Sequence, residues 1–232
     1  MKRKHLLNIA SKIPFPIINT IFLTFPFLYK TNLIRYESGI SKEHTQLLID
    51  GINETKNLHG DIIECGSNRC GTAAILCLFL KSNQIKKIFY ALDSFGGFIP
   101  DEIQKERKLG FTDFPENSYH YNTFDYVKKK IEKLKLSDYI ELKKGFFQET
   151  LPSINSDFCM AFIDCDLGKS INYVAEKIWP HLIKNGLMFF HDYGWKGYQN
   201  VKPTVDAFVK KHQNEIKWHK LESTMYWIKK SD

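Results

Sequence analysis

Residues 61–72, DIIECGSNRCGT, constrain the fold more than any other part of this 232-residue chain. A short apolar run ends in a carboxylate, Glu64, and glycines follow at Gly66 and Gly71. An apolar run with helical character, residues 73–80, comes next. This order predicts a strand, a tight turn and a helix, which together form the opening of a nucleotide-type site.

The carboxylate narrows the choice of cofactor. Glu64 would repel the pyrophosphate of a dinucleotide, and Asn68 stands where the dinucleotide fingerprint has the glycine that lets the backbone approach phosphate. A cationic cofactor that has an adenosine but no phosphate, such as S-adenosylmethionine, fits better. An ordinary strand–helix turn with two glycines remains the alternative, because one glycine-rich turn is a weak signal.

The length and the charge of the chain limit the possible classes of protein. A chain of 232 residues with 43% hydrophobic and 25% charged residues is typical of one soluble globular domain. The net charge of +7 belongs mostly to residues 1–36, which hold six basic residues and no acidic one, so the remaining chain carries only +1. Nucleic-acid binding is therefore not expected, since it needs a basic face on the folded body.

The five cysteines lie at positions 65, 70, 77, 159 and 165, and they form no C-x-x-C pair and no zinc-type spacing. Three of them fall in or beside apolar strand-like runs, which predicts buried free thiols in a reducing compartment. The expected location is the cytoplasm.

Residues 1–36 form a basic, aromatic arm that precedes a domain at 37–232. The apolar run 13–29 is interrupted by Pro14, Pro16 and Pro26 and is too short to span a membrane. No small-residue cleavage site follows, so a signal peptide is not expected. Two interpretations stay open: an arm packed on the domain or on a sister subunit, and an interfacial anchor in which residues 1–30 contact the inner face of the membrane.

Hydrophobic periodicity predicts an α/β fold. Strands are expected at 61–65, 88–92, 139–142, 158–163 and 186–190, followed by a hairpin of 217–222 and 225–229. Helices are expected at 41–57, 72–81, 123–136, 170–183 and 204–212, and a loop at 94–119. This alternation predicts a doubly wound, mostly parallel, Rossmann-like sheet of seven strands with a C-terminal antiparallel hairpin.

Carboxylates recur at the ends of the predicted strands, where ligands bind in such sheets. Glu64, Asp93 and Asp164 each close a hydrophobic strand, and His191 and Asp192 close a fourth. Strand ends are often polar, but that tendency does not explain why carboxylates in particular recur.

With these residues placed, the chain resembles the class I S-adenosylmethionine-dependent methyltransferases, and more closely the macrocin O-methyltransferase family, which methylates sugar hydroxyls. The resemblance runs from about residue 41 to 208. Its motifs are GDIIECG at 60–66 with Arg69 and Gly71, LDSFGG at 92–97, GFFQETLP at 145–152, IDCDL at 163–167, and HDY at 191–193 followed by DAF at 206–208.

The resemblance implies a cofactor site as well as a fold. The methionine part of S-adenosylmethionine would be lined by Glu64, Gly66, Ser67, Gly71 and Thr72; the ribose would meet Asp93 and Ser94; and the adenine would border Gly145, Phe146 and Gln148. A carboxylate suits the ribose because its two oxygens match two hydroxyls. The resemblance also suggests that residues 35–41 close over the cofactor.

Transfer to a sugar hydroxyl needs help at the nucleophile, because the sulfonium already activates the methyl group. A general base or a divalent cation can supply that help. The resembled family holds magnesium with an aspartate after the fourth strand and a pair of acids after the fifth. Asp164 and Asp192 match those positions, and His191 stands in place of the second aspartate of the pair.

Three roles for His191 remain open. It could coordinate a metal softer than magnesium, such as manganese, together with Asp164 and Asp192, because imidazole suits such metals better. It could act as the base. It could also only pack at the strand end. A His, Asp, Asp set would suit an iron oxygenase too, but the Glu64–Gly71 turn argues against one.

Two further departures from the family pattern, Gly97 and Gly168, lie near the expected acceptor pocket and leave the substrate less defined than the cofactor. Asp166 is expected either to orient groups at the site or to be a solvated carboxylate. We interpret the chain as a metal-assisted O-methyltransferase acting on a small-molecule sugar or glycosylated acceptor. A nicotinamide-dependent oxidoreductase and a non-catalytic cofactor-binding relative are the alternatives, and homo-oligomerisation is left open.

Overall fold

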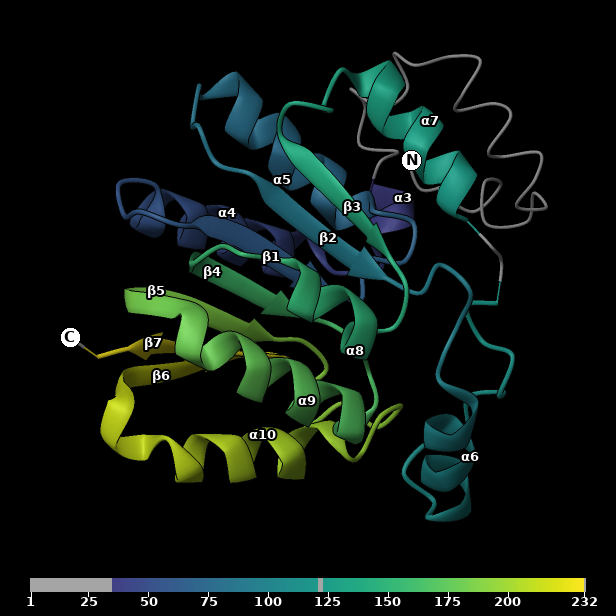
Figure 1. The fold of residues 1–232 in the computed structure, drawn as a ribbon. Helices are drawn as coiled ribbons and strands as arrows, with labels where there is room; N and C mark the ends of the chain where they lie inside the picture. Colours follow the sequence, from purple (N-terminus) through teal and green to yellow (C-terminus); the bar gives the residue numbers. More distant parts are fainter. Residues whose placement is uncertain (1–34, 121–122, 232) are drawn as a thin grey trace, which may run out of the picture.

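The computed structural model describes residues 35–120 and 123–231, with side chains from residue 37 onward. The expectations for the basic arm therefore lie outside the described residues, apart from its last two positions. The described chain forms one seven-stranded sheet in the order β3-β2-β1-β4-β5-β7-β6 (Figure 1). Its strands are β1 (Asp61–Cys65), β2 (Phe89–Asp93), β3 (Ile140–Lys144), β4 (Phe158–Ile163), β5 (Leu182–Phe190), β6 (Ile216–Glu222) and β7 (Met225–Lys230).

Strands β1 to β5 pair in parallel, and β7 runs antiparallel between β5 and β6. The predicted fold class is thus confirmed, including the C-terminal hairpin. The chain leaves β1 toward β2 and β3 on one side and returns to β4 on the other side. The switch point between β1 and β4 is the place where such sheets bind ligands, beyond the carboxyl ends of the strands.

Helices cover both faces of the sheet (Figure 1). They are α3 (Arg35–Ser38), α4 (Lys42–Thr55), α5 (Gly71–Ser82), α6 (Pro100–Lys108), α7 (Phe124–Leu134), α8 (Phe147–Thr150), α9 (Gly168–Ile178) and α10 (Val201–Lys211), with short 3-10 turns η2 (Leu151–Ser153), η3 (Trp179–His181) and η4 (Gln213–Glu215).

The sheet has a hydrophobic core on each face, because successive side chains of a strand point to opposite faces. Ile62 of β1 packs with α4, α5 and α7, whereas its neighbour Ile63 packs with α6, α9 and α10. Phe189 and Phe190 of β5 divide in the same way. Because the central strands are buried on both faces, their sequences read as continuous apolar runs.

Two parts of the predicted element map are wrong. The expected loop 94–119 contains α6, whose first turn holds Pro100 and two acidic residues and whose last turn is basic. Only one apolar side chain of α6, Ile103, is buried, so hydrophobic periodicity could not reveal this helix. The helix expected at 170–183 ends at Ile178, because Pro180 starts a 3-10 turn there, and β5 already begins at Leu182.

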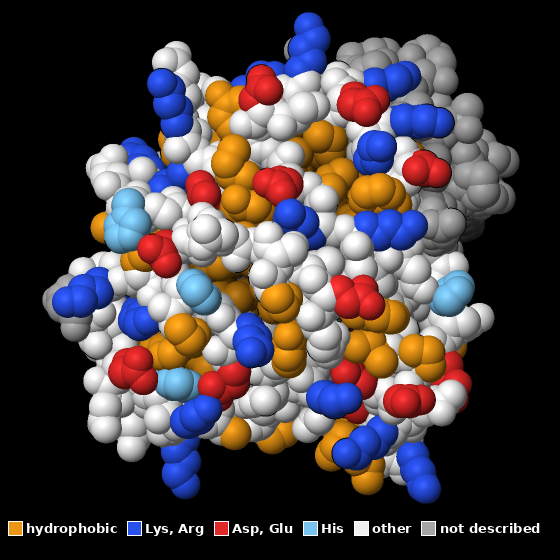
Figure 2. All heavy atoms as spheres, in the orientation of Figure 1, with side chains coloured by type: hydrophobic (Ala, Val, Ile, Leu, Met, Phe, Trp, Pro, Cys, Tyr) orange, Lys and Arg blue, Asp and Glu red, His pale blue; other side chains and the backbone are white. Residues whose placement is uncertain are grey.

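All five cysteines are free and buried, as expected. Within residues 35–120 and 123–231, no helix is long and apolar enough to cross a membrane. On the face seen in Figure 2, basic and acidic side chains are interspersed rather than gathered into one patch of a single sign.

Candidate active site

A cavity of about 680 Å³ opens at the carboxyl edge of the sheet and spans the switch point. Its wall includes Glu64 and Gly66 from the end of β1 and Asp164 from the end of β4. Asp93 lines it beyond β2, and His191 lines it beyond β5. The parallel topology thus brings together the polar strand ends that the sequence singled out.

Two glycines shape the turn after β1 for different reasons. Gly66 has φ +94°, and a Cβ atom there would lie 2.0 Å from the backbone oxygen of Asp164, so no side chain fits between β1 and β4. A Cβ atom on Gly71 would lie 2.3 Å from the backbone carbon of Glu37, so this glycine lets α5 pack against α3. Gly66 forms the floor of the cavity, whereas Gly71 serves helix packing.

Glu64 is the most unusual group in the wall. Its side chain is 2% exposed, and its Oε2 atom has no hydrogen-bond partner among the described residues. Burial, together with the nearby charges of Asp164 and Asp93, raises the pKa of Glu64 to about 8. Within the described part of the chain, the Oγ atom of Ser67 beside it also has no partner of normal geometry. A buried acceptor without a donor is costly, so this corner fits a ligand that brings cationic or N–H groups.

Asp93 organises the loops on either side of it. Its Oδ2 accepts the Asn68 N–H at 2.7 Å, and its Oδ1 accepts the Phe95 N–H at 2.6 Å. Burial nevertheless raises the pKa of Asp93. Each carboxylate oxygen can accept a second hydrogen bond, so the group retains the capacity for two hydroxyl donors.

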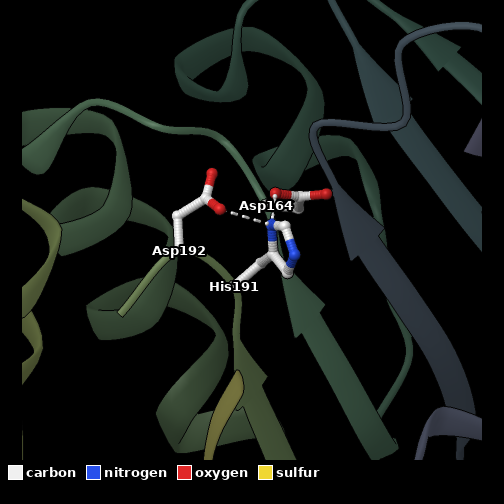
Figure 3. Close-up of side chains that lie close together, drawn as sticks. All are labelled: Asp164, His191 and Asp192. Carbon is white, nitrogen blue, oxygen red and sulfur yellow. Dashed lines mark hydrogen bonds and ion pairs between the residues drawn. The ribbon is translucent and has the colours of Figure 1, made fainter. Parts of the chain in front are cut away.

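An acidic cluster around one histidine lies on the other side of β1. The His191 ring stands between two carboxylates, with Asp164 from the end of β4 and Asp192 following His191 after β5 (Figure 3). Its Nδ1 atom is 3.0 Å from Oδ1 of Asp164 and 3.0 Å from Oδ1 of Asp192. All three side chains are partly buried, with exposed fractions of 12%, 19% and 13% for His191, Asp164 and Asp192.

The two carboxylates decide the charge of the ring. Burial alone would lower the pKa of His191, but the charge of Asp164 and the hydrogen bonds to Asp164 and Asp192 outweigh it and raise that pKa to about 11. A ring protonated at both nitrogens cannot accept a proton. In this arrangement His191 is therefore better suited to orienting carboxylates, or to exchanging its proton for a metal ion, than to acting as the base.

The same three residues suit a divalent cation. One ligand atom from each lies within 4.8 Å of the others. Two ligands that meet one cation at about 2.1 Å and a right angle lie about 3.0 Å apart, which matches both distances from Nδ1 to the carboxylates. The nitrogen ligand favours manganese, iron or zinc over magnesium.

Asp166 also lines the cavity, which supports the first of its two expected roles. Burial and the charges of Asp164 and Asp192 raise its pKa well above the usual range.

Aromatic side chains extend the cavity wall beyond Asp166. Tyr198 stacks on Phe114, with 4.7 Å between ring centroids, and makes a tilted contact with Trp195 at 5.5 Å between centroids.

A buried ion pair fixes the segment above the β1 turn. Lys130 of α7 lies 2.7 Å from Glu37 of α3, and neither side chain is exposed to solvent. Tyr126 donates a hydrogen bond to Glu37, and Lys130 donates another to the backbone oxygen of Arg69. These bonds hold α3 against the β1 turn, and the following residues Ser38, Gly39 and Ser41 line the cavity, as the proposed closing segment requires.

The cavity wall contains all but two of the ten expected cofactor residues: Glu64, Gly66, Ser67, Thr72, Asp93, Ser94, Gly145 and Phe146. Gly71 packs against α3 instead, and Gln148 is an exposed residue of α8. Of the two departures near the acceptor pocket, Gly97 lines the cavity, with φ +100°. Gly168 does not; Asn200 and Thr204 already fill the space that a side chain there would need.

Sequence reasoning missed three contributors to the wall: His44 in the first turn of α4, the aromatic pair Trp195 and Tyr198, and Glu222 with its neighbours in the β6–β7 turn. His44 is buried, with 4% exposure, and neither ring nitrogen has a hydrogen-bond partner among the described residues. Nothing in the helical pattern around His44 distinguishes it from a core residue, so no sequence signal was available.

Comparisons with known proteins bear on the family and on the fold. Residues 42–230 match the family model described as macrocin O-methyltransferase (TylF). Similar solved structures include the O-methyltransferase NovP, with TM-score 0.73 and 18% identity over 92% of this chain and 100% of NovP. The calicheamicin methyltransferase CalS11 has TM-score 0.70 and 16% identity over 99% of this chain and 91% of its own.

An O-methyltransferase from Bacillus cereus, solved in complex with SAH, has TM-score 0.59 and 13% identity over 90% of both chains. At these identities the solved structures show a shared fold. No curated protein matches the sequence significantly.

Proposed function

The chain belongs to the macrocin O-methyltransferase family, and on that premise we propose that it transfers a methyl group from S-adenosylmethionine to a hydroxyl of a sugar or glycosylated small molecule. The observation that carries the proposal is the buried carboxylate of Glu64 in the wall of a cavity of about 680 Å³, because its Oε2 has no hydrogen-bond partner among the described residues. A cationic donor without phosphate would pair with the ionised Glu64 carboxylate. The same carboxylate would repel the pyrophosphate of a dinucleotide. Family membership likewise favours methyl transfer over nicotinamide-dependent oxidoreduction.

The donor would lie along the strand ends from β3 to β1. Glu64 and Ser67 would receive the positively charged methionine part, and Asp93 would accept the ribose hydroxyls. The Gly145–Phe146 turn would border the adenine. Asp164, on the other side of the switch point, would then stand near the acceptor hydroxyl, and the cofactor would supply the activated methyl group.

The acidic cluster would activate the acceptor. Asp164 and Asp192 have carboxylate oxygens that can accept the hydroxyl proton, and protonated His191 would hold both carboxylates in place until its Nδ1 exchanges that proton for a metal ion. These three residues would hold a divalent cation, which supplies stabilisation of the developing alkoxide. Magnesium is the metal that the family resemblance implies, and the imidazole favours a softer one such as manganese.

An acceptor screen tests the proposal. Purified protein would be incubated with S-adenosylmethionine and either magnesium or manganese, against nucleoside diphosphate sugars and simple glycosides, and methylated products identified by mass spectrometry. The proposal predicts a product whose mass is increased by one methylene unit and whose formation stops on addition of EDTA. Donor binding without release of S-adenosylhomocysteine for any acceptor would favour the non-catalytic relative instead.

We further propose that residues 1–30, which lie outside the described residues, make peripheral contact with anionic lipid at the inner face of the membrane. Five basic residues and a run of aromatic ones within residues 1–30 support this proposal. Deleting residues 1–30 should reduce co-sedimentation with anionic vesicles while leaving the thermal unfolding of the domain unchanged. Wild-type protein that ignores such vesicles contradicts it.

A further inference from the structure

His44 is held firmly at the start of α4. Ser41 caps this helix, and its Oγ accepts a hydrogen bond from the His44 N–H at 3.1 Å. The Thr45 hydroxyl also donates to the Ser41 carbonyl, at 2.9 Å. These bonds fix the backbone of the first turn, from which the imidazole enters the cavity wall.

The ring is buried in the cavity wall without satisfying its own polar atoms. Its exposed fraction is 4%, and neither Nδ1 nor Nε2 has a hydrogen-bond partner among the described residues. The backbone of Glu222 makes only a loose hydrogen-bonding contact with the ring, which does not reach normal geometry. Leaving both nitrogens unpaired in a buried position is unfavourable, so the site is built to receive a polar group from a ligand.

The order of the strands shows which ligand can reach His44. Along the carboxyl edge, Asp93 and Gly145 lie beyond β2 and β3, on one side of β1. The acidic cluster lies beyond β4 and β5, on the other side, and the His44 ring meets His191 edge to face at 5.3 Å between centroids. The expected adenosine positions are therefore separated from His44 by the acidic cluster, and the group that reaches both His44 and that cluster is the acceptor.

We propose that His44 is an acceptor-binding residue whose imidazole hydrogen-bonds a hydroxyl of the acceptor next to the acidic cluster. This inference rests on the proposed function. An imidazole has at least one N–H in either protonation state, so it can donate to a hydroxyl oxygen, and when neutral it can also accept from a neighbouring hydroxyl. The first turn of α4 then selects acceptors with a hydroxyl at this place, while β1 and β2 select the donor.

The variant His44→Phe separates this role from packing. Phenylalanine keeps the aromatic ring and removes both nitrogens, so the midpoint of thermal unfolding should stay the same or rise. The KM for the acceptor should rise about tenfold or more, as expected for losing a buried hydrogen bond. The KM for S-adenosylmethionine and the Kd for S-adenosylhomocysteine should stay within about twofold. His44→Gln, which restores a donor and an acceptor, should recover part of the acceptor affinity.

TDP-rhamnose, the substrate in the name of one CalS11 structure, is the first acceptor to test, followed by other nucleoside diphosphate sugars and phenyl glycosides. The matched control is His181→Phe. Its ring is 60% exposed, and His181 precedes β5 at the opposite end of the strand from the cavity, so its kinetics should equal those of wild type.

Each outcome has a distinct meaning. Unchanged acceptor KM in His44→Phe overturns the role of His44 and leaves the proposed function standing. Weaker binding of Mn²⁺ to His44→Phe, measured by electron paramagnetic resonance, also overturns it, because it makes His44 a metal ligand. Wild-type protein that binds S-adenosylhomocysteine but methylates no acceptor removes the proposed function, and this inference with it.

Discussion

Binding of the methyl donor should expel a proton from Glu64. Burial raises the pKa of this carboxyl to about 8 in the unliganded protein, so at pH 7 roughly nine-tenths of the molecules carry the proton. A sulfonium or ammonium group placed beside the carboxylate favours its charged form and lowers that pKa. We therefore expect the release of roughly 0.9 proton for each donor bound at pH 7.

The affinity for S-adenosylmethionine should depend on pH, because donor binding and proton release from Glu64 are coupled. Because the proton must leave before the ion pair forms, the Kd for S-adenosylmethionine should fall by about tenfold per unit as the pH rises from 6 toward 7.5. The α-amino group of the donor titrates near pH 7.7–8 and limits the useful range. Isothermal titration calorimetry in phosphate and in Tris buffer measures the proton count, since the two buffers differ in their heat of ionisation.

Glu64→Gln is the control. It cannot ionise, so its binding enthalpy should not depend on the buffer and its Kd should not depend on pH in this range. Its affinity should be lower by about 10- to 100-fold at pH 7.5, as expected for loss of a charged hydrogen bond. Buffer-independent heats in the wild type, or equal proton release in Glu64→Gln, would refute the assignment.

The raised pKa also affects stability. A folded-state pKa above the unfolded value means that the native protein holds the proton more tightly. The contribution of Glu64 to stability is therefore fully present below about pH 4.5 and is lost as the pH rises to about 8. In the absence of donor, Glu64→Gln should unfold at a higher temperature than wild type at pH 8, and at nearly the same temperature at pH 5.

Three further predictions follow from the geometry. Asp164→Asn and Asp192→Asn should each lower kcat by about 100-fold or more, because these carboxylates face the acceptor. The Kd for S-adenosylhomocysteine should change little. Unchanged kcat in both variants would remove the proposed role of the cluster. Gly66→Ala should destabilise the fold by about 3 kcal/mol or more, because φ is +94° and the new Cβ would meet the Asp164 backbone at 2.0 Å. A cost of about 3 kcal/mol corresponds to a fall of roughly 6–12 °C in the midpoint of thermal unfolding. Lys130→Met should cost about 3–5 kcal/mol in urea unfolding, because it leaves the Glu37 charge buried and unpaired.

Two variants serve as matched controls for the stability predictions. Gly110→Ala has a similar backbone angle, φ +74°, but no atom within 4 Å of the new Cβ, so it should cost only about 1 kcal/mol. Lys202→Met breaks an ion pair with Asp206 in which both side chains are about half exposed, so it should cost much less stability than Lys130→Met. A cost for Gly66→Ala equal to that of Gly110→Ala, or for Lys130→Met equal to that of Lys202→Met, contradicts the packing argument.

Much of the fold could be predicted from the sequence, because the central strands carry strong local signals. The β1 strand, its turn and α5 follow from an apolar run, two glycines and a second apolar run. The parallel arrangement then brings Glu64, Asp93 and Asp164 to one edge, since parallel strands end at the same side of a sheet. No knowledge of side-chain packing was needed for these steps.

The missed features depend on contacts between distant segments. Helix α6 is polar, and its glutamates are used internally: Glu106 accepts hydrogen bonds from the Gly168 N–H at 2.7 Å and from Asn200 at 2.9 Å. The pairing of Lys130 with Glu37 joins residues that are 93 positions apart. His44 reaches the site only because α4 packs beside β4 and β5. Periodicity reports local structure and cannot reveal such contacts.

The most direct test of the central claim is calorimetric titration of the purified full-length protein with S-adenosylmethionine and, separately, with NAD⁺. The account predicts saturable binding of S-adenosylmethionine at one site per chain and no heat of binding from NAD⁺, because a cationic donor pairs with Glu64 as its proton leaves, whereas a pyrophosphate brings no cation to this buried carboxyl group and would repel its ionised form. Tight binding of NAD⁺ without measurable affinity for S-adenosylmethionine would contradict it.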